Sequence, residues 1–294
     1  MAGSVISLIP TLVLFALAQR YFVQGVVLSG TKGKGAAMDT ITFFDANCQV
    51  GRYNYRIEGG PYSRADLSVD GQAQEIARRL VFHAMAKEYS PAVGNQRLLD
   101  ELAGHDGLVP CWVVSSWTSG ETPPPAEMIA SLRERDIRAV RFFREFYNVP
   151  MAEWSMGALW SELEVHRVPL FLDLGLRWAT MDDFNSDEVY DLCHAHPILP
   201  VILVKHRIRY NRRIYQLLEA CPNLRLELSG YWHFRAVEEI CTRFGADRLL
   251  FGTNWPYMDS SFARAMVMYA EVTDSMKAAV AGGNLARLLE GVRW

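Results

Sequence analysis

The sequence lacks an excess of charge of either sign. Its 30 lysines and arginines nearly balance 33 aspartates and glutamates, and the formal net charge is −3. Such a balance offers no electrostatic footprint for a phosphate backbone, so no nucleic-acid partner is expected. Cysteine is also scarce: the five residues are widely spaced and form no C-x-x-C pair, at positions 48, 111, 193, 221 and 241. This spacing excludes a disulfide framework and a zinc finger and favours a reducing, cytoplasmic compartment.

A hydrophobic run long enough for a membrane span is missing as well. The N-terminal apolar run Val5–Ala18 has 14 residues and is interrupted by Ser7, Pro10 and Thr11, whereas a spanning helix needs roughly 20 apolar residues. Ala16-Leu17-Ala18 is similar to a signal-peptide cleavage site, but no basic residue precedes the run, and a signal peptide requires one. We therefore expect no stable membrane insertion.

Residues 1–37 differ from the rest of the chain, because they contain no Asp or Glu and carry only Arg20, Lys32 and Lys34 as charges. Within this stretch, QRYFVQG (19–25) and GTKG (30–33) resemble the C-terminal tail of a sugar ABC-importer permease. The resemblance implies that a neighbouring permease gene has been read into this one and that Met38 is the real start. We predict that residues 1–37 are an apolar extension outside the fold and that residues 38–294 form the folded domain, with a working membrane anchor as the alternative.

From Met38 onward, short apolar runs rich in β-branched residues alternate with helical patterns. The predicted strands are Thr40–Asn47, Arg79–Ala84, Leu108–Val114, Ala139–Phe143, Pro169–Asp173, Val201–Lys205, Leu224–Ser229 and Leu249–Gly252. Eight alternations over ~250 residues are typical of an α/β fold of the (β/α)₈ or TIM-barrel type. The first crossover, Leu67–Ile76, contains Gly71 and has poor apolar periodicity, so a short or irregular helix is expected there.

Polar side chains stand where the predicted strands end. In a TIM barrel, the active site is built at the C-terminal ends of the strands. Strand alternation places Asn47 and Gln49 on one side of the first strand, together with Asp45. The other candidates at strand ends are His83, Arg141, Asp173, Lys205, His206, Asn254 and Trp255.

This layout resembles the amidohydrolase-2 family of TIM-barrel hydrolases and decarboxylases. The segments that carry the resemblance are FFDANCQVGR, HPILPVIL, NLRLELSGY, GADRLLFGTNWP and GGNLARLL, and together they span essentially all of residues 38–294. The resemblance implies a divalent metal, typically zinc, with its hydroxide. Its ligands in the family are His-x-His on the first strand, one His on each of the fifth and sixth strands, and an Asp on the eighth that also acts as base.

Most of these ligand positions hold other residues in this chain. Asn47 and Gln49 occupy the His-x-His positions, Asp173 the fifth-strand position and Asn254 the eighth-strand position; only His206 matches. Neutral amides are poor zinc ligands, and the amide of Asn254 does not take a proton from water at neutral pH. We therefore expect the family's fold without a tightly bound metal, and no other cofactor.

Basic residues dominate the end of the sixth strand, where Lys205, His206 and Arg207 begin a run that continues to Arg213. Clefts lined by one sign of charge concentrate ions of the opposite sign. Arg141 and Arg52 are expected to converge on the same place, because arginine suits carboxylate and phosphate groups. We predict an anion-binding mouth in which His83 and Trp255 also contact the substrate.

The hypothesis favoured by these residues is a hydrolase, or a member of the decarboxylase and lactonase branches. Its substrate would be small and anionic or sugar-derived. Asp173 is the predicted general base and His206 its acid partner, while Asn47, Gln49 and Asn254 hold the reacting carbonyl. One alternative is a ligand-binding pseudoenzyme that has lost the metal chemistry. Another, suggested only by residues 1–37, is a membrane-associated component of a sugar importer; a homo-oligomer is compatible with each.

Overall fold

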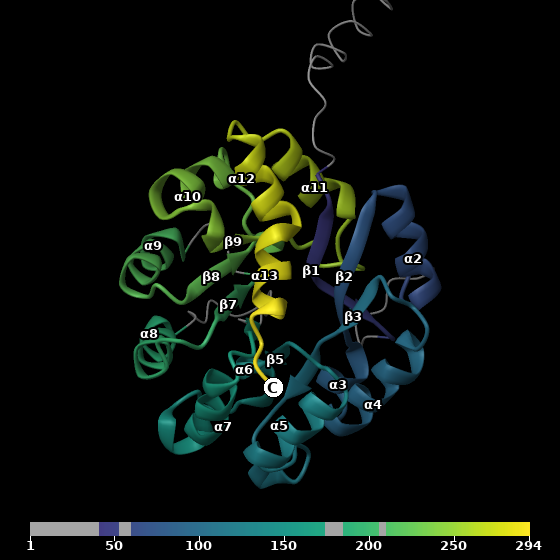
Figure 1. Cartoon of the computed structure of the whole chain (residues 1–294), viewed down its shortest axis with the longest axis vertical. Helices are drawn as coiled ribbons and strands as arrows, with labels where there is room; N and C mark the ends of the chain where they lie inside the picture. The colour runs from purple at the N-terminus through teal and green to yellow at the C-terminus, as the bar shows by residue number, and fades with distance from the viewer. Residues whose placement is uncertain (1–40, 53–59, 174–184, 206–209) are drawn as a thin grey trace, which may run out of the picture. The chain divides into compact units, whose positions relative to one another are not determined.

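A ring of parallel strands forms the centre of the molecule, and helices surround it (Figure 1). The computed structural model describes residues 41–52, 60–173, 185–205 and 210–294. Its strands are β1 (Phe43–Val50), β2 (Ile76–His83), β3 (Leu108–Pro110), β4 (Trp112–Val114), β5 (Val140–Phe142), β6 (Leu170–Asp173), β7 (Val201–Val204), β8 (Leu224–Glu227) and β9 (Leu249–Leu250). All of the pairings between neighbouring strands are parallel.

Hydrogen bonds close the ring where the ladders are interrupted. The third predicted strand is divided at Cys111 into β3, which pairs with β2, and β4, which pairs with β5. The Cys111 N–H donates to the Val81 carbonyl at 2.7 Å. On the other side, the Ala46 N–H donates to the Phe251 carbonyl at 2.9 Å, and the Asn254 N–H donates to the Asn47 carbonyl at 2.8 Å. These bonds join β9 to β1 and confirm the predicted eight-stranded barrel.

The helices follow the strands in the order that the sequence predicts. They are α2 (Arg64–Ala73), α3 (Ala84–Glu88), α4 (Pro91–Leu102), α5 (Pro125–Glu134), α6 (Arg144–Tyr147), α7 (Glu153–Val165), α8 (Ser186–Ala195), α9 (Asn211–Ala220), α10 (Ala236–Phe244), α11 (Ser260–Met268), α12 (Asp274–Ala278) and α13 (Asn284–Glu290). Short 3-10 segments η1 (Trp117–Ser119), η3 (Leu228–Gly230) and η4 (Ala246–Arg248) and a π-helical turn η5 (Ala279–Gly283) complete the described chain.

The first crossover differs from the prediction, because α2 is a regular helix of 10 residues. Ser63 accepts a hydrogen bond from the Asp66 N–H, and the Asp66 carboxylate accepts one from the Ser63 N–H. This reciprocal cap satisfies two backbone donors at the start of the helix and compensates for its weak apolar pattern.

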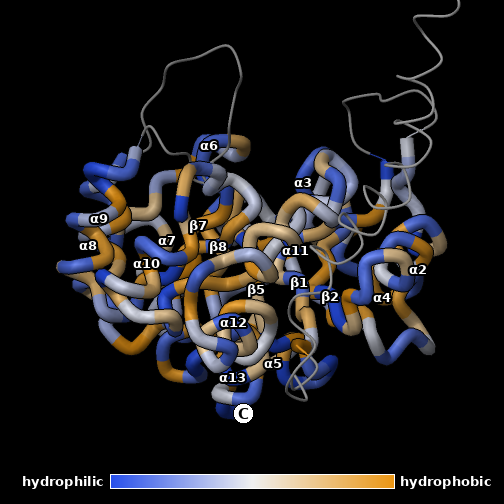
Figure 2. Tube along the Cα trace, turned by 90° about the horizontal axis from the view of Figure 1, so that it is seen from above, coloured by the Kyte–Doolittle hydropathy of each residue, from blue (hydrophilic) through white to orange (hydrophobic). Residues whose placement is uncertain are grey.

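The core consists of two layers. Side chains from the strands fill the barrel, among them Phe44, Phe82 and Phe171, and Leu285 and Leu289 of α13 join this interior cluster. Figure 2 shows α13 at one end of the barrel and α3 and α6 at the other. We refer to the end near α3 and α6, where the strands finish, as the mouth.

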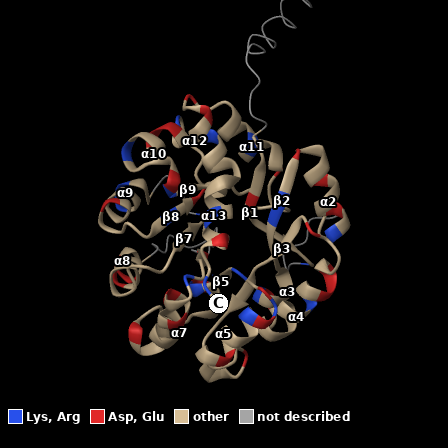
Figure 3. Cartoon of the chain, viewed as in Figure 1, with Lys and Arg blue, Asp and Glu red and all other residues tan. Residues whose placement is uncertain are grey.

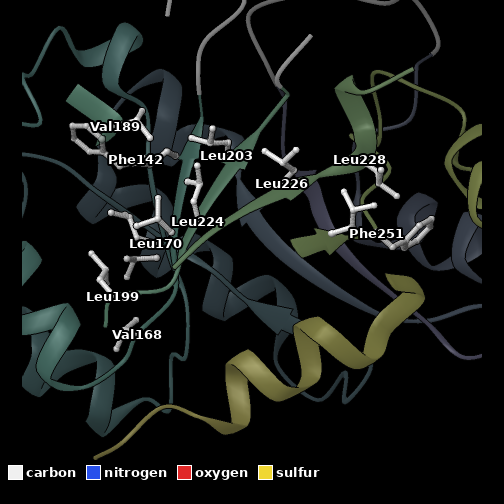
Figure 4. Packing of buried hydrophobic residues seen from close by; sticks show 14 of the residues in the cluster. Phe142, Val168, Leu170, Val189, Leu199, Leu203, Leu224, Leu226, Leu228 and Phe251 are labelled. Atoms are coloured by element: carbon white, nitrogen blue, oxygen red, sulfur yellow. The ribbon is translucent and has the colours of Figure 1, made fainter. Parts of the chain in front are cut away.

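A second layer lies between the strands and the outer helices. Phe142 on β5 meets Trp160 of α7 edge to face, with ring centroids 5.4 Å apart. Leu203 of β7 and Leu226 of β8 are directly paired, and Figure 4 shows them among the leucines of neighbouring strands. Strands that are buried on both faces read as continuous apolar runs, which explains segments such as VILV at 201–204.

None of the helices among the described residues combines the length and the apolar composition that crossing a membrane requires. The run Val5–Ala18 and the rest of the predicted extension lie outside the described residues. The residues from Ile41 to Trp294 form one structural unit.

Candidate active site

A bulge in β1 decides which of its polar residues reach the mouth. The ladder between β1 and β2 slips between Asp45 and Cys48. Asn47 contacts residues on β5 and β8, whereas both oxygens of Asp45 accept hydrogen bonds from Thr253, at 3.0 and 2.6 Å. The prediction that Asp45 and Asn47 share one side is therefore wrong, because the extra residue of a bulge breaks strand alternation.

Arg141 lies at the centre of the polar cluster. From the middle of β5, its Nη1 donates to Asn47 Oδ1 at 2.8 Å and its Nη2 to Asp173 Oδ2 at 2.5 Å. Its guanidinium also stacks over Phe82, 4.5 Å from the ring centroid. The side chain is only 2% exposed, so its hydrogen bonds and the aromatic ring hold the charge in a fixed position.

Lys205 supplies a second cation. It directly follows β7, and its Nζ lies 3.2 Å from Asp173 Oδ2. Burial by itself would raise the pKa of Asp173, but Lys205 and Arg141, with a further contribution from Lys87, outweigh it and hold that pKa well below its usual value. Asp173 is therefore a carboxylate that stays ionised and is shared by two cations.

Glu227 completes the cluster at the end of β8. Its Oε2 accepts hydrogen bonds from Asn47 Nδ2 at 3.1 Å and from Ser229 Oγ at 2.7 Å, and its Oε1 accepts one from the Ser229 N–H at 2.6 Å. Burial raises the pKa of Glu227 to about 7, although the bonds from Ser229 oppose the shift. Glu227 is not among the site residues predicted from the sequence. The available signal was a glutamate in the otherwise apolar alternation of LRLEL.

A glycine makes room for this carboxylate. A Cβ added at Gly252, which follows β9, would lie 2.0 Å from Glu227 Oε1. Glycine is therefore required at position 252 by the close approach of the chain to Glu227.

The other residues predicted at the mouth have different neighbours. Arg52 is exposed and donates to the Tyr62 hydroxyl at 2.8 Å, so it does not converge with Arg141. His83 is buried; its Nδ1 accepts from the Met85 N–H at 3.0 Å, and its Nε2 lies 3.4 Å from Glu101 Oε1. Burial lowers the pKa of His83. Both side chains thus have local structural partners away from the cluster.

The predicted residues on β1 and after β9 help to close the barrel. The Trp255 ring belongs to the buried layer beneath the helices, and its carbonyl accepts from the Gln49 N–H at 3.1 Å. Gln49 is buried, and its Nε2 has no hydrogen-bond partner among the described residues. Asn254 is half-buried, with a backbone φ of 56°. His206 and Arg207 lie outside the described residues.

The charged cluster does not suit a divalent metal. Asn47, Asp173 and Glu227 offer oxygen atoms, but the guanidinium of Arg141 already lies between Asn47 and Asp173. Within the part of the chain that the structure describes, no group of three His, Cys, Asp or Glu residues is arranged to hold a metal ion. A bound divalent ion would have to displace a buried cation, which the surrounding groups stabilise where it is.

Other charges are distributed around the barrel. Figure 3 shows acidic and basic residues interspersed on the outer helices, with an acidic position on β1 and a basic one on β2. On β2, Arg79 Nη2 pairs with Asp70 Oδ2 of α2 at 2.5 Å, and its Nη1 lies 3.6 Å from Asp45 Oδ2. This buried network joins the strands to α2 and meets the cluster around Arg141 at Asn47, whose N–H donates to Asp45 Oδ1 at 2.9 Å.

A family comparison agrees with the fold. The family model described as Amidohydrolase matches residues 51–291. The chain therefore belongs to the amidohydrolase-2 family. A search of curated protein sequences gave no match.

Solved structures resemble the chain at low sequence identity. An uncharacterised TIM-barrel protein from Bordetella bronchiseptica has a TM-score of 0.67 and 15% identity, with 85% of this chain and 99% of that chain covered. A 5-carboxyvanillate decarboxylase from Sphingomonas paucimobilis has a TM-score of 0.65 and 11% identity, over 85% and 99%. A 2,6-dihydroxybenzoate decarboxylase from Rhizobium has a TM-score of 0.60 and 14% identity, over 85% and 98%. At these identities, the likeness establishes the TIM-barrel fold.

Proposed function

We propose that this protein is an enzyme that decarboxylates or hydrolyses a small carboxylated substrate without a tightly bound metal ion. The observation that carries the proposal is the pair of cations beside the protonatable Glu227, namely the buried Arg141 and the partly buried Lys205. Fixed cations in a buried site stabilise negative charge on a substrate and on the transition state. Two of the structural neighbours are named as decarboxylases of carboxylated phenols, which supports a substrate of this chemical class.

The two carboxyl groups of the cluster suit different tasks. A general acid or base works best when its pKa lies near the operating pH. Glu227, with a pKa of about 7, meets this condition, whereas Asp173 is held ionised by Lys205 and Arg141 and is a weak base. In this proposal the proton transfer predicted for Asp173 passes to Glu227, and Asp173 positions the two cations.

A turnover assay with a matched pair of variants tests the proposal. The purified chain is offered carboxylated phenols, oxo acids and lactones, with and without a chelator, and CO₂ release and ring opening are followed. Glu227→Gln keeps the shape but removes the titratable group, so we expect turnover to fall ~10²–10⁴-fold. Glu219→Gln, at an exposed position on α9, serves as the control and should leave turnover unchanged.

Three results would contradict the proposal. Equal turnover in Glu227→Gln would remove Glu227 from the chemistry. Full loss of activity in chelator, with one equivalent of zinc or manganese in the purified protein, would show a resident metal. Tight binding of a carboxylate without turnover of any compound would favour the ligand-binding pseudoenzyme.

We also propose that the protein works in the cytoplasm. All five cysteines are buried free thiols, which supports a reducing compartment.

A further inference from the structure

Two of the five cysteines lie beside each other at the end of the barrel opposite the mouth. Cys193 is in the last turn of α8, which leads into β7, and Cys221 directly follows α9, which leads into β8. The two helices are neighbours in the outer layer (Figure 1). The side chains of the two cysteines share a hydrogen bond, so their sulfur atoms are close together.

Buried polar side chains fix the backbone on both sides of this pair. Asn223 Nδ2 donates to the Cys193 carbonyl at 3.3 Å and also to carbonyls of the turn before β7. Arg248 Nη2 donates to the Cys221 carbonyl at 2.7 Å. Both of these polar side chains belong to buried residues. The fold itself therefore brings the two thiols together, because the end of each helix is tied to the neighbouring strands.

The two thiols differ in acidity, which suits one of them to attack an oxidant. The hydrogen bond from Cys193 lowers the pKa of Cys221, and the guanidinium of Arg248 lowers it further, although burial opposes the shift. The same hydrogen bond, together with burial, raises the pKa of Cys193. Thiolates and not thiols react with peroxides. Cys221 is therefore the nucleophile, and Cys193 is the second thiol beside it.

The other three cysteines have surroundings that keep them protonated. Burial raises the pKa of Cys111 to about 12 and that of Cys241 to about 11. Cys48 Sγ donates a hydrogen bond to the Leu80 carbonyl at 3.4 Å. These three thiols serve as internal controls for the reactivity of the pair.

The pair lies just beneath the surface of the protein. Both thiols are only 2% exposed, but the residues next to them in the chain are exposed, namely His194, Ala220 and Pro222. Helix ends open locally at a small cost in free energy. An oxidant the size of a water molecule needs only such a small opening to reach Cys221.

We propose that Cys193 and Cys221 form a redox modification site, which hydrogen peroxide oxidises reversibly to a disulfide between α8 and α9. Disulfides that form in a reducing compartment are usually transient and catalytic or redox-sensing. The inference does not depend on the reaction proposed above, because the pair lies at the end of the barrel opposite the mouth.

Each step of the oxidation balances in atoms and electrons. The Cys221 thiolate attacks one oxygen of hydrogen peroxide, so that an S–O bond forms, the O–O bond breaks and hydroxide leaves. This hydroxide takes up the proton that Cys221 has released and becomes water. The Cys193 sulfur then attacks the Cys221 sulfur; the S–S bond forms, the S–O bond breaks, and hydroxide leaves with the Cys193 proton as a second water. Two electrons pass from sulfur to the peroxide, and a small thiol reverses the bond by exchange.

Thiol counting on the unmodified chain tests the site directly. The reduced full-length protein is treated with hydrogen peroxide under native conditions, catalase removes the excess, and free thiols are alkylated in denaturant. We expect three alkylated thiols, the five of the reduced chain less the linked pair, and a mass lower by two hydrogen atoms before alkylation. A digest without reductant should contain one linked peptide pair, with Cys193 and Cys221, and a phosphine should restore all five thiols.

Three serine variants assign the roles of the two thiols. Cys193→Ser should stop at the sulfenic acid of Cys221, which dimedone traps. Cys221→Ser should lose both the disulfide and the sulfenic acid. Cys241→Ser is the control, because Cys241 is a buried cysteine on α10, and it should form the disulfide as the native chain does.

Several results would overturn the proposal. The first is a native chain that keeps five alkylatable thiols after peroxide. Others are a linked pair that includes another cysteine or joins two chains, and a sulfenic acid at Cys111 or Cys241 in place of Cys221. If the chain unfolded in urea forms the bond between Cys193 and Cys221 as fast as the native chain does, the fold does not create the site. Thiol counting uses the unmodified protein, so this result does not depend on the folding of a variant.

Discussion

At the scale of single residues, the pKa values of two carboxyl groups in one cluster are shifted in opposite directions. Asp173 contacts two cations, which favour its ionised form, whereas Glu227 is buried among the neutral donors of Asn47 and Ser229. Burial acts on both carboxyl groups, so the partners decide the outcome. The sequence identified Asp173 as a polar residue at a strand end, but it could not show that Arg141 and Lys205 both contact it, since the pattern of one strand does not reveal side-chain contacts to the neighbouring strands β5 and β7.

The shifted pKa of Glu227 predicts a pH dependence of stability. Its pKa rises from 4.5 to about 7 on folding. Below pH 4.5, Glu227 is protonated in both the folded and the unfolded chain. Between pH 4.5 and 7 only the folded chain holds this proton, so the contribution of Glu227 to stability is lost as the pH rises. We expect the free energy of unfolding of the native chain, relative to Glu227→Gln, to fall by up to about 3 kcal/mol over this window. Urea unfolding of both proteins at several pH values measures this difference.

The comparison with Glu227→Gln isolates one group. Burial also raises the pKa of Asp45, but Asp45 is present in both proteins and its contribution cancels. A difference in unfolding free energy that stays constant between pH 4.5 and 8 would show that Glu227 is ionised in the folded state throughout this window.

At the scale of elements, the sequence predicted the strands whose formation depends on a local run of apolar residues. The strand Pro169–Asp173 became β6 (Leu170–Asp173) and Val201–Lys205 became β7 (Val201–Val204), because runs of buried apolar residues are a local signal. The bulge in β1 and the division of the third strand were not predictable, since both depend on hydrogen bonds to distant segments, such as that from Ala46 to Phe251. The regular helix α2 was predictable in principle from its capping pair, Ser63 and Asp66.

The junction between β8 and the segment after β9 gives a prediction on packing. In Gly252→Ala, the new Cβ would lie 2.0 Å from Glu227 Oε1, so the carboxylate or the chain must move. Overpacking of this kind costs typically ~1–3 kcal/mol, and the displaced Glu227 should also reduce turnover. Gly71→Ala is the matched control, because its Cβ would come no closer than 3.4 Å to Arg79 Nε and Ile76 O.

The control variant Gly71→Ala is expected to leave the stability unchanged or to raise it. Gly71 lies inside α2, where alanine is favoured over glycine by up to ~1 kcal/mol. Thermal unfolding should therefore show Gly252→Ala below the native chain and Gly71→Ala equal to it or above it. Equal melting temperatures for Gly252→Ala and the native chain would mean that Glu227 does not pack against position 252.

At the scale of the whole molecule, the fold and the site depend on different residues. The barrel is stabilised by its two buried layers and by α13 at one end, while the polar cluster lies where the strands finish. TIM barrels vary their chemistry through residues at this face without changing the scaffold. This separation explains how the sequence identified the family and the fold correctly from residues outside the site. The partners of Arg141, Lys205 and Glu227 came only from the structure.

The barrel is also expected to fold without the N-terminal extension, residues 1–37. The strand β1 pairs with β2 and with the segment after β9. The start of β1 also packs on η5, where a Cβ added at Gly282 would lie 2.8 Å from the Thr42 carbonyl. We therefore expect a chain that begins at Met38 to unfold at the same temperature as the full chain in calorimetry. A chain that begins at Ala46 loses the first three of the eight residues of β1 and should not fold, because the barrel then lacks a complete closing strand. If the shorter deletion already melts at a markedly lower temperature, residues 1–37 contribute to the fold.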